Sequence, residues 1–481
     1  MYLGTRIIFN GAVVGKNLGI FSSLILARRE NPEAAFQPYI LSRIQNASND
    51  DPSLFVDPLR LSLWCKCQFF RHYHPDSKQI LLDSAVEGHV LVKNANNALP
   101  LKRPRLLSLF GYDCLAPRKM NVPSPATFGI SGWGFGYESS NVTQAFLELL
   151  SGTGTLPQYA AGGTIISGGG SGANAPPYIS APFDAILEQA HKDNTGLFWD
   201  FDSVSPNVDA ESSACLVFIN AFSAEGFDRV GLHDDYSDAL VLNIASKCNN
   251  TIVIIHNAGI RLVDQWIDHP NVTAVMFAHL PGQESGRALV QLLYGYKSPS
   301  GKLPYTVARN ESDYNVLSPA LPEGRYSVFP QSIVPRYEFG FGLSYTTFEY
   351  DDLRLSLYPN ASTSYYPPNS TVLPGGLASL WDVILRAEAM VKNTGQMAAA
   401  EVSQLYVAFP GDSTAVKQLR GFAKTFMNPG ESKQIRFALT RRDLSRWSAV
   451  DQAWVLQRGT YEVYVGASSR DLSLSGRVVI P

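Results

Sequence analysis

The group best suited to acid–base chemistry in this sequence is a glutamate beside a glycine, just after a short apolar run. The run is Cys215–Ile219, and the segment Ala224–Arg229, which reads AEGFDR, begins five positions later. A loop at the carboxyl end of a parallel strand is where open α/β sheets place functional groups. Phe222 and Phe227 could desolvate the Glu225 carboxyl group and raise its pKa, as a general acid needs. The chain has 42 acidic residues and most carboxylates are solvated surface groups, so position alone does not establish the role.

A glycine-rich segment, Gly168–Ala173, follows a predicted strand at Thr164–Ser167 and fits the spacing of a dinucleotide-binding loop. Such a loop needs a helix directly after it, so that backbone amides and the helix dipole point at the phosphate. The next residues, Asn174–Pro177, cannot readily begin that helix. The segment also misses the serine-hydrolase elbow, because Ala173 replaces the second flanking glycine. We therefore predict no nucleotide cofactor.

A group of soft ligands, Cys65–Cys67 with His72 and His74, could bind zinc. The two-residue cysteine spacing is not that of the usual zinc knuckle, and the intervening residues are rich in apolar side chains. Ordinary packing and a linker histidine explain the group better, so no metal site is predicted. His256 and His279 each stand at the end of an apolar strand; histidines there can line a site, although a structural role is commoner.

Short apolar runs that alternate with helical stretches must position these groups. The runs are apolar throughout, which is typical of parallel strands covered on both faces. The sequence therefore predicts a mostly parallel α/β sandwich domain over residues 76–345. The predicted strands are Leu106–Phe110, Ala214–Ile219, Thr251–Ile255 and Val272–Ala278, and the predicted helices between the later ones are Ser237–Lys247 and Gln283–Tyr294.

The start of the chain is less regular. Residues 1–75 lack sustained periodicity and are predicted to be an irregular N-terminal segment or linker remnant. A helix is predicted after them, with Asp76 as its N-cap and with Leu82, Val86 and Val90 on one face.

The hydrophobic period falls to two in the last part of the chain. A leading loop over 358–375 is rich in Ser, Pro, Asn and Thr, and short alternating strands come after it, separated by turn signals. We therefore predict an antiparallel β-sandwich over residues 346–481. The alternating positions are Leu405, Val407 and Phe409; Ile435, Phe437 and Leu439; and Tyr461, Val463 and Val465.

Charge and hydropathy exclude two classes of partner. The 481 residues include 39 basic and 42 acidic side chains, for a net charge of −3, so no basic field favours nucleic acid. No apolar run reaches the roughly 18 residues that span a bilayer, so no membrane partner is expected.

Six segments, in order, together resemble glycoside hydrolase family 3, particularly the fungal β-glucosidases. They cover about 74–481, and six ordered motifs are far more specific than any one of them. The last resembles the family's fibronectin-III-like domain, so the predicted architecture is an α/β sandwich followed by a fibronectin-III-like β-sandwich. The segments are Glu87–Asn94 with Leu99–Leu101; Gly168–Gly172 with Pro177–Tyr178; Ala224–Arg229; Pro281–Glu284 with Pro299–Pro304; Tyr337–Tyr345; and Lys392–Gly395 with Gln404–Val407 and Leu419–Phe422.

The resemblance implies a retaining hydrolase that acts on terminal β-linked glucose in aryl glucosides, cellobiose or cello-oligosaccharides. By its place in the motif, Glu225 corresponds to the family's acid/base. Phe227 stands where the family has a tyrosine near the aglycone, and with Asp228 it is predicted to contact substrate. Ala224 replaces a family glycine, so the details of the subsite differ. No cofactor is implied.

Retention requires a second carboxylate about 5–5.5 Å from the acid/base, to attack the anomeric carbon. In the family this nucleophile is the Asp of a Ser-Asp-Trp motif on an N-terminal (β/α)₈ barrel, and Ser-Asp-Trp occurs nowhere in this chain. A barrel needs roughly 200 residues or more, and only about 75 precede the recognisable domain. Asp200, Asp202 and Asp228 are nearby carboxylates, but none matches a family position. We therefore expect a chain that lacks most or all of the barrel.

Two hypotheses arise from this shortfall. The chain is a β-glucosidase that has lost its barrel and is inactive alone, or it is a non-catalytic carbohydrate-binding or interaction remnant; a barrel supplied by another chain is a third arrangement. The face around Glu225 that a barrel would cover should be apolar, which favours a homodimer or aggregation through that face.

Seven glycosylation sequons suggest secretion, although Met1–Glu30 is a poor signal peptide because Lys16 interrupts its apolar stretch and Arg28–Glu30 come directly after it. Five cysteines leave one unpaired and do not fix the pairing. The candidate glycosylation sites are Asn46, Asn141, Asn249, Asn271, Asn310, Asn360 and Asn369.

Overall fold

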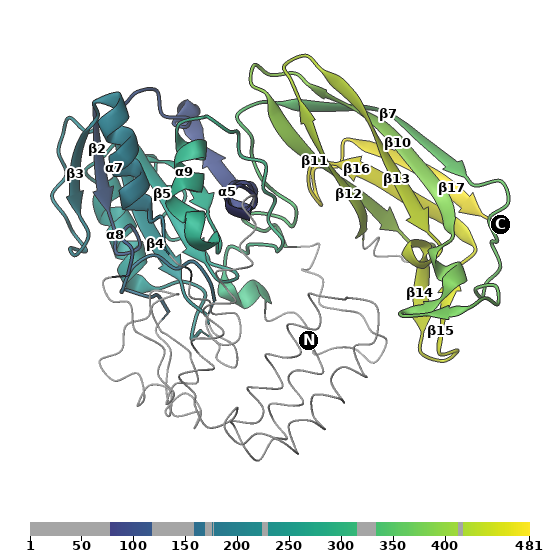
Figure 1. Ribbon diagram of the computed structural model, residues 1–481. Helices are drawn as coiled ribbons and strands as arrows, with labels where there is room; N and C mark the ends of the chain where they lie inside the picture. The colour runs from purple at the N-terminus through teal and green to yellow at the C-terminus, as the bar shows by residue number, and fades with distance from the viewer. Residues whose placement is uncertain are drawn as a thin grey trace, which may run out of the picture. The chain divides into compact units, whose positions relative to one another are not determined.

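A computed structural model describes residues 77–117, 158–168, 176, 178–223, 229–314, 333–411 and 417–481 (Figure 1). One compact unit, Ile80–Pro481, contains both a large mixed sheet and a β-sandwich. Several residues singled out in the sequence lie outside the described part. These are Cys65, Cys67, His72, His74, the glutamate Glu225 with Phe227 and Asp228, and the sequon residues Asn46 and Asn141.

A six-stranded sheet forms the centre of the first domain, in the order β1-β6-β5-β4-β2-β3. Five strands are parallel, and only β1 runs antiparallel, against β6. The predicted strands Leu106–Phe110, Ala214–Ile219, Thr251–Ile255 and Val272–Ala278 are confirmed, with ends that shift by two residues or fewer. The strands are β1 (Val90–Asn94), β2 (Leu106–Phe110), β3 (Gly196–Asp200), β4 (Ala214–Ala221), β5 (Thr251–Asn257) and β6 (Val272–Phe277).

Helices cover both faces of this sheet, as the uniformly apolar strands predict (Figure 1). On one face, α7 (Pro182–Asp193) and α9 (Ser285–Leu293) contribute Ile186 and Leu289 to a buried cluster. On the other face, α8 (Asp235–Ala245) contributes Leu240 to a second cluster. The helix α8 begins where Asp234 caps it, because the Asp234 carboxylate accepts a hydrogen bond from the Ser237 amide.

Two local predictions are wrong. The first helix, α5 (Ser77–Gly88), ends at Gly88, so Val90 begins strand β1 and does not continue the helical face. Thr164–Ser167 is buried but is not a strand. Its amides are used elsewhere: the Thr164 amide donates to Leu115 O at 2.8 Å, and the Ile165 amide donates to the Asp113 carboxylate at 3.1 Å.

The predicted β-sandwich is present as a three-stranded sheet, β13-β10-β7, and a four-stranded sheet, β12-β11-β16-β17. The alternating residues predicted to face inward, such as Leu405, Phe437 and Val463, are buried in one core cluster. The strands are β7 (Phe348–Leu357), β10 (Val383–Asn393), β11 (Ala399–Ala408), β12 (Gln418–Met427), β13 (Ser432–Thr440), β16 (Gly459–Gly466) and β17 (Leu474–Ile480); the short strands outside these sheets are β8 (Val372–Leu373), β9 (Gly376–Leu377), β14 (Ser445–Ser448) and β15 (Ala453–Leu456).

A disulfide joins Cys215 in β4 to Cys248 just after α8, and Cys114 is a buried free thiol. Within the described ranges, no helix is long and apolar enough to cross a membrane. The same ranges contain no group of three or more His, Cys, Asp or Glu side chains that could hold a metal ion.

Candidate active site

The carboxyl ends of the parallel strands meet at one edge of the sheet, where the polar candidates gather. Asp113 follows β2, Asn220 lies near the end of β4, His256 lies near the end of β5, and His279 follows β6. The chain leaves β4 at this edge shortly before the segment that holds Glu225, which lies outside the described residues. The described side chains therefore show what surrounds that segment at its two ends.

The Asp113 carboxylate, which follows β2, joins three other parts of this edge. It accepts hydrogen bonds from the Asn220 side-chain amide at 2.8 Å, from the Ile165 backbone amide at 3.1 Å and from Nδ1 of His256. Burial raises the pKa of Asp113, and His256 and the hydrogen bonds oppose that rise. One buried carboxylate thus links β2, β4, β5 and the loop at 158–168.

The far nitrogen of the same imidazole, His256 Nε2, lies 2.9 Å from Ser285 Oγ. The order Asp113–His256–Ser285 is that of a nucleophilic triad. All three side chains have zero solvent exposure, so no substrate carbonyl could reach the hydroxyl. The geometry therefore positions the edge of the sheet and does not form a serine nucleophile.

Asn220 anchors the end of β4 just upstream of the Glu225 segment. Its Oδ1 accepts from the Ala160 amide at 2.8 Å, and its Nδ2 donates to Ala160 O at 2.9 Å. Two residues on, the Phe222 amide donates to Gln158 O at 3.2 Å. Asn220, Ala160 and Phe222 are buried, so these hydrogen bonds hold the point from which the segment departs.

A second polar group lies at the ends of β5 and β6. His279 Nδ1 donates to Gly88 O at 3.1 Å, so Nε2 is the acceptor for the Tyr305 hydroxyl at 2.8 Å, and that hydroxyl accepts from Asn257 Nδ2 at 2.7 Å. Burial lowers the pKa of His279, which agrees with this neutral tautomer. His279, Tyr305 and Asn257 therefore present neutral hydrogen-bond donors and acceptors at this edge.

Arg229 marks the downstream end of the Glu225 segment. Its Nη2 donates to Ile260 O at 2.5 Å, which fixes the guanidinium against the loop that follows β5. Burial lowers the pKa of Arg229, and the nearby Arg261 lowers it further. The segment therefore rejoins the described chain next to a positive charge.

Glu284 is a buried carboxylate at this edge that sequence reasoning noted only as part of a motif. It is 1% exposed; the Tyr178 hydroxyl donates to its Oε1, and Arg287 Nη1 lies 3.3 Å from its Oε2. Its place directly before helix α9 was the signal that could have singled it out. Because both of its oxygens have partners, Glu284 does not offer a free attacking carboxylate.

The predicted local carboxylates at β3 have a simpler role. Asp200 Oδ1 accepts from the amides of Asp202 and Ser203, at 3.1 and 3.0 Å, and so closes the turn after the strand. This turn accounts for Asp200, and neither aspartate belongs to the Asp113–His256 group.

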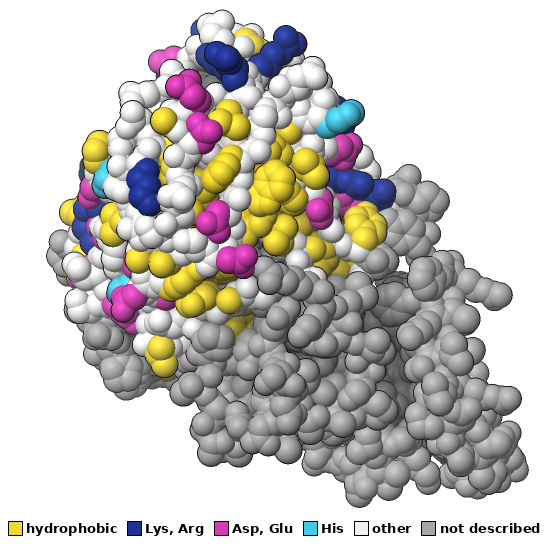
Figure 2. Space-filling view, turned by 90° about the vertical axis from the view of Figure 1, so that its left-hand side faces the viewer, with side chains coloured by type: hydrophobic (Ala, Val, Ile, Leu, Met, Phe, Trp, Pro, Cys, Tyr) yellow, Lys and Arg dark blue, Asp and Glu magenta, His cyan; other side chains and the backbone are white. Residues whose placement is uncertain are grey.

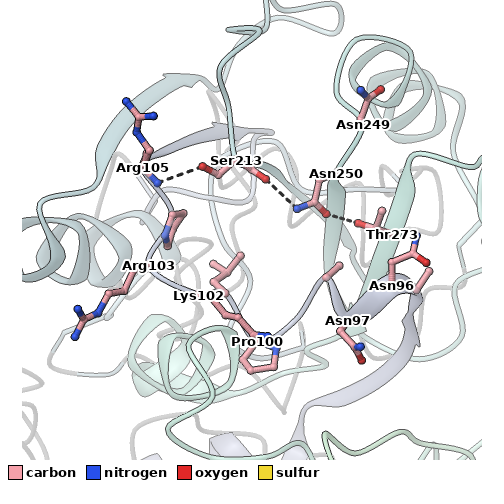
Figure 3. Close-up of a pocket in the computed structure, with 14 residues that line it drawn as sticks. Asn96, Asn97, Pro100, Lys102, Arg103, Arg105, Ser213, Asn249, Asn250 and Thr273 are labelled. Atoms are coloured by element: carbon pink, nitrogen blue, oxygen red, sulfur yellow. Dashed lines mark hydrogen bonds between the residues drawn. The ribbon is translucent and has the colours of Figure 1, made fainter.

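A cavity of about 610 Å³ lies at the opposite, amino edge of the sheet (Figure 3). A row of hydrogen bonds crosses it, from the Arg105 amide to Ser213 Oγ, from Asn250 Nδ2 to Ser213 O, and from Thr273 Oγ1 to Asn250 Oδ1 (Figure 3). Its lining includes Lys102 and Arg103 and no acidic residue. It offers no carboxylate, so it cannot supply the pair of carboxylates that a retaining glycosidase requires.

The sequence profile of the glycosyl hydrolase family 3 C-terminal domain matches residues 89–345, and that of the fibronectin type III-like domain matches residues 401–469. Probable β-glucosidase M of Aspergillus flavus is 52% identical over 423 residues, which are 84% of this chain and 51% of that protein. β-Glucosidase cel3A of Pyricularia oryzae is 50% identical over 427 residues, 84% of this chain and 53% of that protein.

Solved structures agree with these matches. The β-D-glucoside glucohydrolase of Trichoderma reesei is similar with a TM-score of 0.70 at 33% identity, over 85% of this chain and 56% of that one. The β-glucosidase D2-BGL of Chaetomella raphigera is similar with a TM-score of 0.68 at 34% identity, over 85% and 55% of the two chains. The chain thus spans about half the length of the curated relatives it matches.

Proposed function

Because the chain belongs to glycoside hydrolase family 3, we propose that it supplies the acid/base half of a β-glucosidase site. The substrates would be aryl β-glucosides, cellobiose and cello-oligosaccharides, cleaved at the terminal non-reducing β-D-glucosyl residue with retention. The names of its relatives support this activity, since they are β-glucosidases at about half identity.

The observation that carries the proposal is the anchored exit of β4. Asn220, one residue before the end of β4, is held by Asp113 and Ala160, and the AEGFDR segment begins within four residues. A carboxylic acid on a loop at this edge is placed where a parallel sheet presents groups to a ligand. We propose Glu225 as that acid, with Phe227 and Asp228 as substrate contacts.

The chemistry asks two things of Glu225. As a general acid, it protonates the glycosidic oxygen while a second carboxylate attacks the anomeric carbon; as a general base, it then takes a proton from the water that hydrolyses the glucosyl intermediate. The second carboxylate would have to lie about 5–5.5 Å away. Because the chain has no Ser-Asp-Trp sequence, we propose that it does not turn over substrate by itself.

An assay of the purified chain on an aryl β-glucoside tests this proposal. We expect no release of the aryl alcohol above the uncatalysed rate. Turnover that disappears in Glu225→Ala would contradict the claim that the chain is inactive alone, while supporting the acid/base role. Binding of cello-oligosaccharides without turnover, unaffected by Glu225→Ala, would favour the second hypothesis, a carbohydrate-binding or interaction module.

We infer that the α/β domain gives way to the β-sandwich at about residue 345, where one family match ends and before β7 begins at Phe348. Secretion and glycosylation are inferred from the sequons. Of these, Asn249, Asn310, Asn360 and Asn369 are exposed on the described surface.

A further inference from the structure

Strand β3 forms one edge of the six-stranded sheet and, among the described residues, pairs only with β2. It reads Gly-Leu-Phe-Trp-Asp, and its aromatic residues are well exposed: Phe198 by 37% and Trp199 by 49%. Natural proteins usually protect such edges with lysine, proline or a bulge. Gly196–Asp200 has no lysine and no proline, and its register with β2 has no shift.

The backbone groups that point away from β2 can be assigned. The Gly196 amide donates to Arg105 O at 2.8 Å, so Gly196 faces β2, and in a parallel pair the inward-facing residues alternate. Phe198 and Asp200 therefore face β2 as well. Leu197 and Trp199 direct their N–H and C=O groups outward, at the free edge.

The side chains beside this edge form an apolar surface. On the face of the sheet that α7 covers, Trp199 packs edge to face against Phe183, with ring centroids 5.2 Å apart, and Leu187 of α7 is 47% exposed. On the other face, Phe198 contacts Phe110, with ring centroids 6.3 Å apart. Figure 2 looks onto the side of the molecule that carries β3 and shows hydrophobic side chains gathered there, with acidic side chains spaced around them.

We propose that this edge is a docking surface for a second copy of the chain, with β3 pairing antiparallel to β3 of the partner across a two-fold axis at Phe198. In this register Leu197 lies opposite the partner's Trp199, and Trp199 lies opposite the partner's Leu197. These are the residues whose backbone groups point outward, so two N–H and two C=O groups from each copy form four hydrogen bonds. A two-fold axis requires such self-complementarity.

The side chains fit the same register. Leu197 and Trp199 share the α7 face, so each apolar side chain meets an apolar partner, and Phe198 meets its own copy on the opposite face. Asp200 lies opposite the partner's Gly196, so the only charged residue of the strand does not face a like charge. The sheet would continue through both copies, and neither β3 edge would remain open.

Other occupants fit the edge less well. The rings of Phe183, Trp199 and Phe201 meet at interplanar angles of 60° and 76°, so they present no flat platform on which successive sugar rings could stack. On α7, Asp184 opposes an anionic partner such as nucleic acid or an acidic lipid surface, and the neighbouring Glu188 is paired with Lys192 at 2.8 Å. A second copy of the chain would use the backbone groups of β3 that face away from β2, whereas a sugar chain or an anionic partner would not.

Sedimentation velocity of the 481-residue chain over about a hundredfold range of micromolar concentration tests the proposal. We expect a monomer–dimer equilibrium that Phe198→Lys shifts to monomer, because it places two like charges opposite each other. Val479→Lys replaces a similarly exposed residue, at the β17 edge of the sandwich, and should leave the dimer intact. Circular dichroism of each variant checks that it is folded.

Cross-linking tests the register itself, and it remains informative if Phe198→Lys does not fold. Residues opposite each other in a non-hydrogen-bonded pair have Cα atoms about 4.5 Å apart, within the range of about 4.4–6.8 Å for a disulfide. Oxidised Phe198→Cys should therefore give a 198–198 linked peptide in mass spectrometry. Trp199→Cys should give at least about tenfold less of the 199–199 linked peptide, because the partner's Leu197 lies opposite position 199. Three results would overturn the proposal. The first is a chain that is monomeric at every concentration, and the second is a dimer that Val479→Lys breaks and Phe198→Lys does not. The third is a monomer whose tryptophan fluorescence changes when cellohexaose is added.

Discussion

His256 and Ser285 meet inside the protein, with Nε2 and Oγ 2.9 Å apart and both side chains fully buried. The other nitrogen of His256 contacts the Asp113 carboxylate. The arrangement connects the end of β5 to the first turn of α9 and, through Asp113 and Asn220, to the end of β4. An arrangement that looks catalytic in its residue types is thus the internal support of the sheet edge on which the proposed acid/base loop begins.

Removal of the Asp113 carboxylate should be strongly destabilising. Asp113→Ala would leave three buried donors without an acceptor, on His256, Asn220 and Ile165, and we expect a loss of about 3–5 kcal/mol in the free energy of unfolding. Ser285→Ala, which removes one hydroxyl from the same group, should cost about 1–2 kcal/mol. Urea denaturation measures both. Equal, small losses in the two variants would show that Asp113 does not hold the edge together.

The buried His89 predicts a loss of stability in acid. Burial lowers the pKa of His89 from 6.5 to about 3; its Nδ1 donates to Ala85 O at 2.6 Å, while Nε2 has no hydrogen-bond partner among the described residues. Because the unfolded chain binds the proton more readily, stability is fully present above about pH 6.5 and falls as the pH drops towards 3. Between pH 6 and pH 4 this group should remove about 2–3 kcal/mol.

His89→Gln isolates that contribution, since His279 also has a lowered pKa and adds to the same trend. Unfolding free energies measured in urea from pH 4 to about pH 7 should fall less steeply for the variant than for the natural chain. The comparison uses the slope with pH, so a general loss of packing in the variant does not affect it. Identical slopes would mean that His89 is not a buried neutral imidazole.

Among the described cations of the α/β domain, Arg261 should be the one whose replacement lowers the free energy of unfolding most. It is fully buried, with Nη2 2.8 Å from Asp238 Oδ1 and 3.3 Å from Asp234 Oδ2. Arg261→Met would leave two buried carboxylates without their cation, and we expect about 3–5 kcal/mol of destabilisation. Lys192→Met removes the cation of an exposed pair with Glu188 and should give no measurable change in denaturation midpoint. Similar midpoints for both variants would contradict this assignment.

The described sequons should not be modified equally. Asn249, Asn310, Asn360 and Asn369 are exposed, whereas the Asn271 side chain is half-buried and its Nδ2 donates to Ala245 O at 2.8 Å. A glycan bonds to Nδ2 and replaces one of its two hydrogens, so its attachment at Asn271 would crowd this half-buried contact. Glycopeptide mapping of the chain secreted from a fungal host should find glycans among the four exposed sites and an unmodified Asn271. A fully occupied Asn271 would contradict the local structure.

The sequence predicted most of the sheet because buried parallel strands leave a strong signal. Runs such as Leu106–Phe110 and Thr251–Ile255 are apolar throughout, and their ends are nearly correct. The edge strands β1 and β3 were missed for different reasons. Strand β1 begins at Val90, which continues the apolar pattern of the preceding helix, and β3 is short and half-exposed. Thr164–Ser167 was wrongly predicted as a strand because its apolar residues are buried although the segment is a loop.

The candidate site was only partly accessible to sequence reasoning. His256 was noted because it ends an apolar strand, but Asp113, its partner, lies 143 residues away and carries no motif. Contacts at that separation depend on how the strands are ordered in the sheet, which periodicity does not specify. Glu225 was identified through its motif, and its role stays a prediction.

The most direct test of the central claim is the chemical rescue of a Glu225 variant. A chimera would combine residues 77–481 of this chain with the part of the Aspergillus flavus relative that the match does not cover. In that chimera, Glu225→Ala should reduce hydrolysis of unactivated β-glucosides by about 10²–10⁴-fold, the usual contribution of a general acid. The second substrate is a dinitrophenyl β-glucoside, because the dinitrophenolate group leaves without protonation. On it, added azide should restore turnover and yield β-glucosyl azide, because a small anion can replace the water that Glu225 no longer activates. An Asp202→Asn chimera is the control and should behave as the parent. Unchanged hydrolysis in Glu225→Ala, or a loss that azide does not rescue, would contradict Glu225 as the acid/base.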